Sequence, residues 1–190
     1  SLEKGKDADF ILLSGDPLPG RSGHIYAPQV DPTPAGYTKG GPLDMLDYRS
    51  AVDLWSARRA DRQALIAGSD VKVSAPGSNQ PPVMRPMLAT TADFFPMFDV
   101  PFRYGSSWTT ADDAGRARVA VISASLNDRL FGGRNSVGRT LHLKDSDVRI
   151  VGVLDAWRPS PLFYDVRGGR FAQGQTAGFY GKPEDVFMPF

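Results

Sequence analysis

The segment from residue 92 to residue 154 constrains the fold more than any other part of this sequence. Its run Val119–Ile122 is apolar without interruption, which is typical of a strand that is buried on both faces. Residues 140–143 and 148–151 alternate between polar and apolar side chains around a polar turn, which predicts a β-hairpin with His142 facing solvent. Strands of this kind mixed with helices indicate an α+β fold of mixed helices and β-hairpins.

Helices are expected at three places. Ser123 or Ser125 can cap a helix that continues through Phe131 and ends at Gly132-Gly133. The longest helix is predicted from Asp44 to Gly68, with Asp44 or Asp47 as its cap and Gly68 as its end. Tyr48, Val52 and Trp55 would form its apolar face. Asp93 could cap a short helix that reaches Phe98.

Further strands are predicted at residues 10–13, 71–73, 83–90 and 185–190, and Pro86 suggests an edge or a bulge in the third of them. Residues 15–42 and 159–183 are rich in glycine and proline, so we expect loops there. The pattern changes near residue 91, which marks a boundary between two subdomains.

The composition excludes several classes of protein. The 22 lysines and arginines nearly balance the 21 aspartates and glutamates, which argues against a protein that binds nucleic acid. The chain contains no cysteine, so disulfides and thiolate metal sites are excluded. No apolar run approaches the ~18 residues that span a bilayer, and no signal peptide is visible. The sequence starts at Ser1 without a methionine, which suits a fragment of a longer protein.

Candidate catalytic groups are few. Neither His24 nor His142 has a second ligand at a metal-binding spacing, so no metal is expected. Asp112-Asp113 could belong to an acid/base pair, although in a turn before the strand they would more naturally accept hydrogen bonds from backbone amides. Ser123 or Ser125 with His142 could supply parts of a hydrolytic triad, but the G-x-S-x-G motif is missing. A Walker A motif is missing as well, and no cofactor is expected.

Two groups of side chains are candidates for contact with a partner or substrate. Arg58, Arg59 and Arg62 would lie late on the long helix, either as a solvated face that the helix dipole favours or as a docking surface. Trp157, Phe163 and Tyr164 would belong either to the core or to a contact patch. The sequence leaves both alternatives open.

The ordered motifs of the central segment resemble those of the periplasmic core domain of MacB-type ABC-transporter permeases, in the wider superfamily that includes LolC and FtsX. The resemblance rests on Ala92-Asp93-Phe94-Phe95, Phe131-Gly132-Gly133, Val137-Gly138-Arg139-Thr140-Leu141 and Val186-Phe187-Met188-Pro189. The segment Tyr104-Gly105-Ser106-Ser107-Trp108 departs from the Gly-Arg-x-Phe that family members often carry there. The proline-rich and glycine-rich loops also differ from the family, which leaves the substrate open.

The resemblance implies a partial porter-like subdomain at residues 1–91 and a Sabre-like small α/β subdomain at 92–190, which together form one periplasmic core domain. The function implied is non-catalytic: export and mechanotransmission across the bacterial inner membrane, with the domain facing the periplasm or the cell exterior. The implied partners are a cytoplasmic ATPase reached through transmembrane helices outside this sequence, a second permease copy and a periplasmic adaptor. Two alternatives are a periplasmic substrate- or peptide-binding module and a secreted hydrolase that uses Asp112, Asp113 or Glu184.

Overall fold

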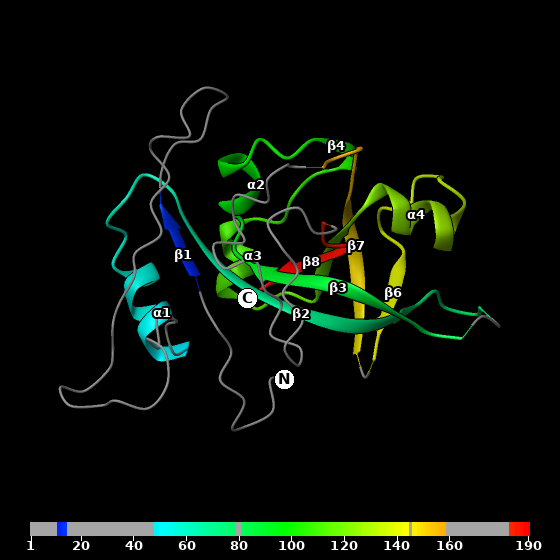
Figure 1. The fold of residues 1–190 in the computed structure, drawn as a ribbon, viewed down its shortest axis with the longest axis horizontal. Helices are drawn as coiled ribbons and strands as arrows, with labels where there is room; N and C mark the ends of the chain where they lie inside the picture. The colour runs from blue at the N-terminus through cyan, green and yellow to red at the C-terminus, as the bar shows by residue number, and fades with distance from the viewer. Residues whose placement is uncertain (1–10, 15–47, 79–80, 145, 159–182) are drawn as a thin grey trace, which may run out of the picture.

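A computed structural model of the chain describes residues 11–14, 48–78, 81–144, 146–158 and 183–190. Its strands form one mixed sheet, in which neighbours follow the order β1-β2-β3-β8-β5-β7-β4, while β6 pairs with both β2 and β7 (Figure 1). Together with four helices in the described residues, this sheet confirms the predicted α+β class. The strands are β1 (Ile11–Ser14), β2 (Gln63–Ser74), β3 (Val83–Thr90), β4 (Phe102–Gly105), β5 (Val119–Ile122), β6 (Thr140–Leu143), β7 (Ser146–Leu154) and β8 (Val186–Pro189).

The helices of the described residues are short: α1 (Tyr48–Ser56), α2 (Phe94–Met97), α3 (Thr110–Ala114) and α4 (Ala124–Phe131). The short helix predicted after residue 93 is therefore present, but the side chain of Asp93 makes no capping hydrogen bond. Its carboxylate instead accepts a hydrogen bond from the backbone amide of Gln63 at 3.3 Å. The caps proposed at Asp44 and Asp47, the two glycine- and proline-rich loops, and His24 lie outside the described residues.

The long helix predicted from Asp44 to Gly68 is wrong in its second half. Arg58 has a left-handed backbone (φ 47°) and turns the chain, and β2 begins at Gln63. In β2, Ala64 and Ile66 pack in the main core, whereas Leu65 and Ala67 face α1 on the other side of the sheet. A strand covered on both faces is apolar without alternation, and periodicity alone does not distinguish it from a buried helix.

Strand β8 joins the two parts of the chain that the sequence separates near residue 91. It pairs in parallel with β3 through Met87–Thr90 and antiparallel with β5 through Val121 and Ile122. Pro86 lies in β3 just before the pairing with β8 begins, where a missing amide donor costs no hydrogen bond to β8. The sheet and the main core therefore run through both parts, and their division into two subdomains stays a prediction.

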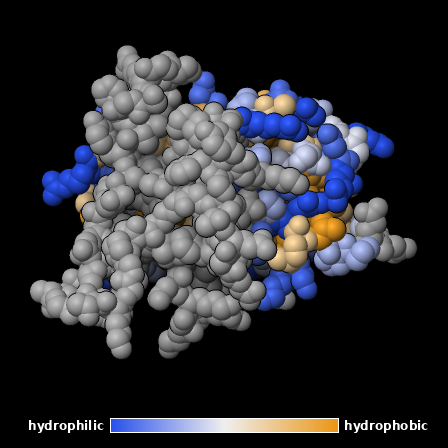
Figure 2. All heavy atoms as spheres, viewed as in Figure 1, coloured by the Kyte–Doolittle hydropathy of each residue, from blue (hydrophilic) through white to orange (hydrophobic). Residues whose placement is uncertain are grey.

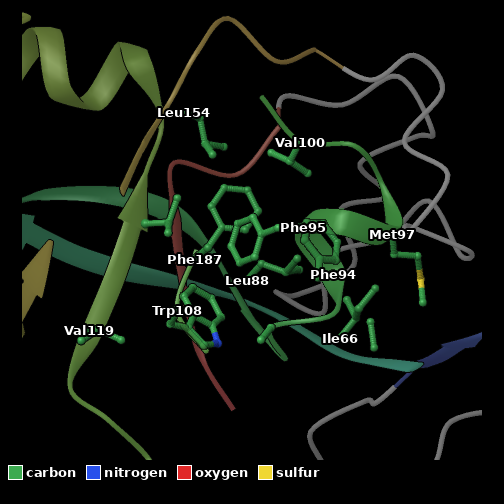
Figure 3. Packing of buried hydrophobic residues seen from close by; sticks show 13 residues of the cluster. Ile66, Leu88, Phe94, Phe95, Met97, Val100, Trp108, Val119, Leu154 and Phe187 are labelled. Atoms are coloured by element: carbon green, nitrogen blue, oxygen red, sulfur yellow. The ribbon is translucent and has the colours of Figure 1, made fainter. Parts of the chain in front are cut away.

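The main core is built from aromatic side chains of α2, β8 and the chain before α3. Phe94, Phe95, Trp108 and Phe187 point toward one another in Figure 3, and each is at most 3% exposed. The Phe95 and Trp108 rings meet edge to face at a centroid distance of 4.8 Å. Edge-to-face contact is the favoured geometry for aromatic rings, so this cluster stabilises the packing of α2 against the sheet.

The predicted hairpin is present as β6 and β7, with Leu141 and Leu143 buried and His142 half-buried on the opposite face. At the far edge, β4 approaches β7 so closely that a Cβ atom on Gly152 would lie 2.4 Å from the carbonyl oxygen of Ser106. Glycine is therefore required at this position, because any side chain would push the two strands apart.

Helix α4 follows the predicted pattern, with the Ser123 hydroxyl accepting a hydrogen bond from the amide of Leu126 at 3.1 Å and Gly132 ending the helix at φ 65°. We expect Ser123→Ala to lower the free energy of unfolding by about 1 kcal/mol, because that amide loses its cap. Urea unfolding followed by circular dichroism measures the change. Ser125→Ala is the matched control: it removes a second hydroxyl that bonds Asp185 but not the cap, so an equal loss would contradict the capping role.

Candidate functional site

The three arginines proposed for partner contact follow α1 and do not lie on it, because the helix ends before them. The guanidinium carbon of Arg58 lies 4.7 Å from the centroid of the Trp55 ring, and its Nη1 atom lies 3.6 Å from a carboxylate oxygen of Asp93. Arg59 is exposed and Arg62 is half-buried. Arg58 is also exposed but has structural contacts of its own.

Of the three aromatic residues proposed for partner contact, the structure describes only one. Trp157 is half-buried and packs against the main core, where its ring lies 6.1 Å from that of Phe94 and 6.2 Å from that of Phe187. Phe163 and Tyr164 lie outside the described residues. Trp157 therefore lies at the margin of the core, with part of its surface packed on Phe94 and Phe187.

The acidic pair Asp112-Asp113 bonds backbone amides, as the sequence suggested. Asp112 and Thr109 form a capping box at the start of α3, in which the carboxylate accepts hydrogen bonds from the Thr109 amide at 2.8 Å and hydroxyl at 2.7 Å. Asp113 is buried and accepts one hydrogen bond from the Ala92 amide at 2.8 Å and another from the Trp108 indole at 2.7 Å. The two carboxylates thus have separate structural partners.

Their environments shift the two pKa values in opposite directions. Burial raises the pKa of Asp113 above its ordinary value of 3.8, although the hydrogen bonds from Ala92 and Trp108 oppose this. The backbone and side-chain hydrogen bonds from Thr109 lower the pKa of Asp112. Each carboxylate is engaged by the fold, so the geometry favours structural roles over acid/base chemistry. Glu184, the third carboxylate considered for hydrolysis, is also buried.

The residue types of a hydrolytic triad do not come together. The Ser123 and Ser125 hydroxyls both donate to the same carboxylate oxygen of Asp185, at 2.5 and 3.0 Å. His142 instead pairs with Asp147 across the β6–β7 hairpin. No group of three or more potential metal ligands was found among the described residues.

A cleft that the sequence did not predict lies between α4, the β2–β3 turn and the start of β6. It has a volume of about 410 Å³, and its lining includes Arg129, Arg139, Phe131, Ser78 and Thr140. These elements lie together at the β6 end of the sheet in Figure 1. The described side chains on that part of the face in Figure 2 are mainly hydrophilic and surround a small hydrophobic group. Its size suits a small-molecule ligand.

The chain matches a known protein family and resembles solved structures. The family model described as the MacB-like periplasmic core domain matches residues 13–190. The extracellular domain of the noncanonic ABC-type transporter YknZ from Gram-positive bacteria is similar in structure, with a TM-score of 0.51 and 14% identity over 96% of this chain and 73% of that one. The periplasmic region of MacB from Actinobacillus actinomycetemcomitans has a TM-score of 0.49 and 12% identity, over 78% of this chain and 60% of that one.

No curated protein matches the chain. Among the described residues, no helix has the length and apolar character needed to cross a membrane. The chain spans less than two thirds of the MacB periplasmic region.

Proposed function

Because this chain belongs to the family of MacB-like periplasmic core domains and is the periplasmic domain of an ABC transporter permease, we propose that it transmits motion between the membrane and a substrate during export. In this proposal the domain itself is non-catalytic. A cytoplasmic ATPase supplies the energy through transmembrane helices outside this sequence, and two permease copies move against each other on the periplasmic side of the inner membrane. A periplasmic adaptor is a further proposed partner.

The observation that supports transmission is the continuity of the sheet from β1 to β8. Strand β1 pairs with β2, β2 with β3, and β3 with β8, so these strands are linked by backbone hydrogen bonds throughout. Val186 and Phe187 of β8 are fully buried. A sheet linked in this way moves as a rigid body. A displacement applied to β1 or to β8 would therefore move the whole domain.

A second link ties α1 to the end of β8. The Tyr48 ring stacks on that of Phe190, with a centroid distance of 5.6 Å and an interplanar angle of 9°. The Tyr48 hydroxyl accepts a hydrogen bond from Arg116 at 3.1 Å. Because α1 is fixed in this way, the adjacent Arg59 and the half-buried Arg62 would move with the sheet, and we propose them, with Arg58 and Trp157, as partner contacts.

Site-specific labelling of the full-length permease tests both the location and the motion of the domain. Met84 is 53% exposed on β3, and the 190 residues contain no cysteine, so Met84→Cys adds one accessible thiol. We expect a membrane-impermeant maleimide to label this thiol in spheroplasts without lysis. Ala120→Cys is the control, since Ala120 is fully buried and its thiol should react only after unfolding. Labelling of Met84→Cys only after lysis would contradict the periplasmic location.

The same thiol, carrying a spin label, reports on motion. We expect the distance between the labels of two permease copies to change between the ATP-bound and ADP-bound transporter. A label pair at positions 69 and 84 within one copy should keep its distance, because both residues lie on paired strands of the sheet. An inter-copy distance that is the same in both nucleotide states would contradict mechanotransmission.

A further inference from the structure

The cleft beside α4 has the charge of an anion-binding site. Arg129 and Arg139 are both exposed side chains that line it, and the described residues of its lining include no carboxylate. Within the described part of the chain, neither arginine forms a salt bridge. Asp128, the acidic neighbour of Arg129 in the sequence, lies 3.8 Å from Arg103. The positive charge at the cleft is therefore not neutralised by the described carboxylates around it.

One of the two guanidinium groups is already held in place. The Arg139 guanidinium carbon lies 5.0 Å from the centroid of the Phe131 ring, which is only 8% exposed. This cation–π contact restricts the side chain before any ligand binds, so less conformational entropy is lost on binding. A planar guanidinium can donate two parallel hydrogen bonds to a phosphate or carboxylate. Arg139 is thus suited to orient such a group.

The carboxyl end of α4 opposes this attraction only in part. The helix dipole places about half a negative charge there, and a bound anion would be repelled by it. The carbonyls of Asp128 and Asn127 near this end accept hydrogen bonds from Gly132 and Gly133, at 3.0 and 3.4 Å, which reduces their effect. Two full positive charges therefore outweigh the partial negative charge of the helix end.

A smaller and more apolar space adjoins the charged one. It has a volume of about 130 Å³ and is lined in part by Val73, Pro81, Val83 and Leu130. Arg129 and Leu130 line both spaces, so the two spaces adjoin at these side chains. The combination selects for a ligand with an anionic group at one end and a short apolar group at the other.

From this geometry we propose that the cleft binds a small amphiphilic organic anion: a phosphate or carboxylate group held by Arg129 and Arg139, with a short apolar substituent against Leu130, Val73 and Val83. The inference does not depend on the transport role, because it rests on the cleft alone. It assigns to this face of the domain a binding function in addition to transmission.

Calorimetric titration of the 190-residue chain at low salt tests the inference, with butyl phosphate as the probe and inorganic phosphate and n-butanol as its two halves. We expect saturable binding of butyl phosphate that is about tenfold tighter than binding of phosphate, since burying two methylene groups is worth about that factor. The double variant Arg129→Gln with Arg139→Gln should weaken butyl phosphate by about 100-fold, or tenfold for each charge-assisted contact. Arg139→Lys should give an intermediate loss, because it keeps the charge without the bidentate geometry.

Arg134→Gln is the matched control, because it removes the same charge from an exposed arginine of the neighbouring loop that does not line the cleft. It should leave the affinity for butyl phosphate unchanged, and a melting curve checks that every variant is folded. If the double variant does not fold, the single variants carry the same test. The inference is overturned by the absence of saturable binding, by equal affinity for phosphate and butyl phosphate, or by a loss in Arg134→Gln that matches the cleft variants.

Discussion

Phe94→Ala is expected to destabilise the domain by about 3–5 kcal/mol, the range typical for removal of a fully buried phenylalanine side chain. Phe94 is completely buried, and its ring contacts those of Phe95, Phe98, Trp157 and Phe187 at centroid distances between 4.9 and 6.1 Å. These neighbours come from α2, β8 and the segment after β7, so the cavity left by the substitution is lined by elements that cannot all move inward. A loss of this size is a large fraction of the stability of an ordinary domain.

Urea unfolding measured by both circular dichroism and tryptophan fluorescence checks the expected loss. Phe94→Leu should cost less, because it keeps most of the apolar volume. Met84→Ala is the control for truncation of an exposed side chain and should stay within about 0.5 kcal/mol of wild type. An effect of Phe94→Ala as small as that of Met84→Ala would show that the aromatic cluster does not form the core.

Much of the fold follows from local signals in the sequence. The unbroken run of β5, the serine cap and glycine end of α4, and the alternation of β6 and β7 all act within about ten residues, and the structure contains each of them. Strands β1 and β3 were also expected close to their observed bounds. The first half of β2 was missed because its burial is determined by α1 on one face and the main core on the other.

The candidate cleft could not be predicted from local sequence patterns either. Arg139 immediately precedes the predicted strand at residues 140–143, and Arg129 lies in the last turn of a helix. What makes them a pair is the β2–β3 turn, which is distant in the sequence and reaches the cleft because β2 also pairs with β6 through Val73 and Ser74. A contact between such distant segments leaves no periodic or motif signal in one sequence. The backbone hydrogen bond of Asp112, in contrast, was expected from local structure, whereas that of Asp113 joins it to Ala92, 21 residues away.

Asp113→Ala is the second substitution for which a large loss is expected, because it leaves two buried donors without an acceptor. The Ala92 amide begins the segment that leads into α2, and the Trp108 indole, 3% exposed, packs edge to face on Phe95. Each unsatisfied buried donor costs about 1–3 kcal/mol, so we expect a total loss of about 2–6 kcal/mol. Asp113→Asn should also destabilise, since the two donors bond different carboxylate oxygens and the amide nitrogen of asparagine presents hydrogens to one of them.

The pH dependence of this loss distinguishes the role of Asp113 from that of an exposed carboxylate. Because burial raises its pKa in the folded protein, the folded state holds the proton more tightly than the unfolded state, whose pKa is near the ordinary 3.8. The stability contributed by Asp113 is therefore fully present below the unfolded pKa and declines as the pH rises through the folded pKa. The difference in unfolding free energy between wild type and Asp113→Ala should consequently grow as the pH is lowered from 7 toward 4.

Asp112→Ala is the matched control, because the hydrogen bonds from Thr109 lower the pKa of Asp112 and reverse the sign. Its contribution to stability is present above the unfolded pKa and declines as the pH falls through the folded pKa. Chemical unfolding of the three proteins at a series of pH values measures both trends. If the loss in Asp113→Ala shrank toward acidic pH as that in Asp112→Ala does, burial would not dominate at Asp113, and the link between α2 and α3 would depend on an ordinary ionised carboxylate.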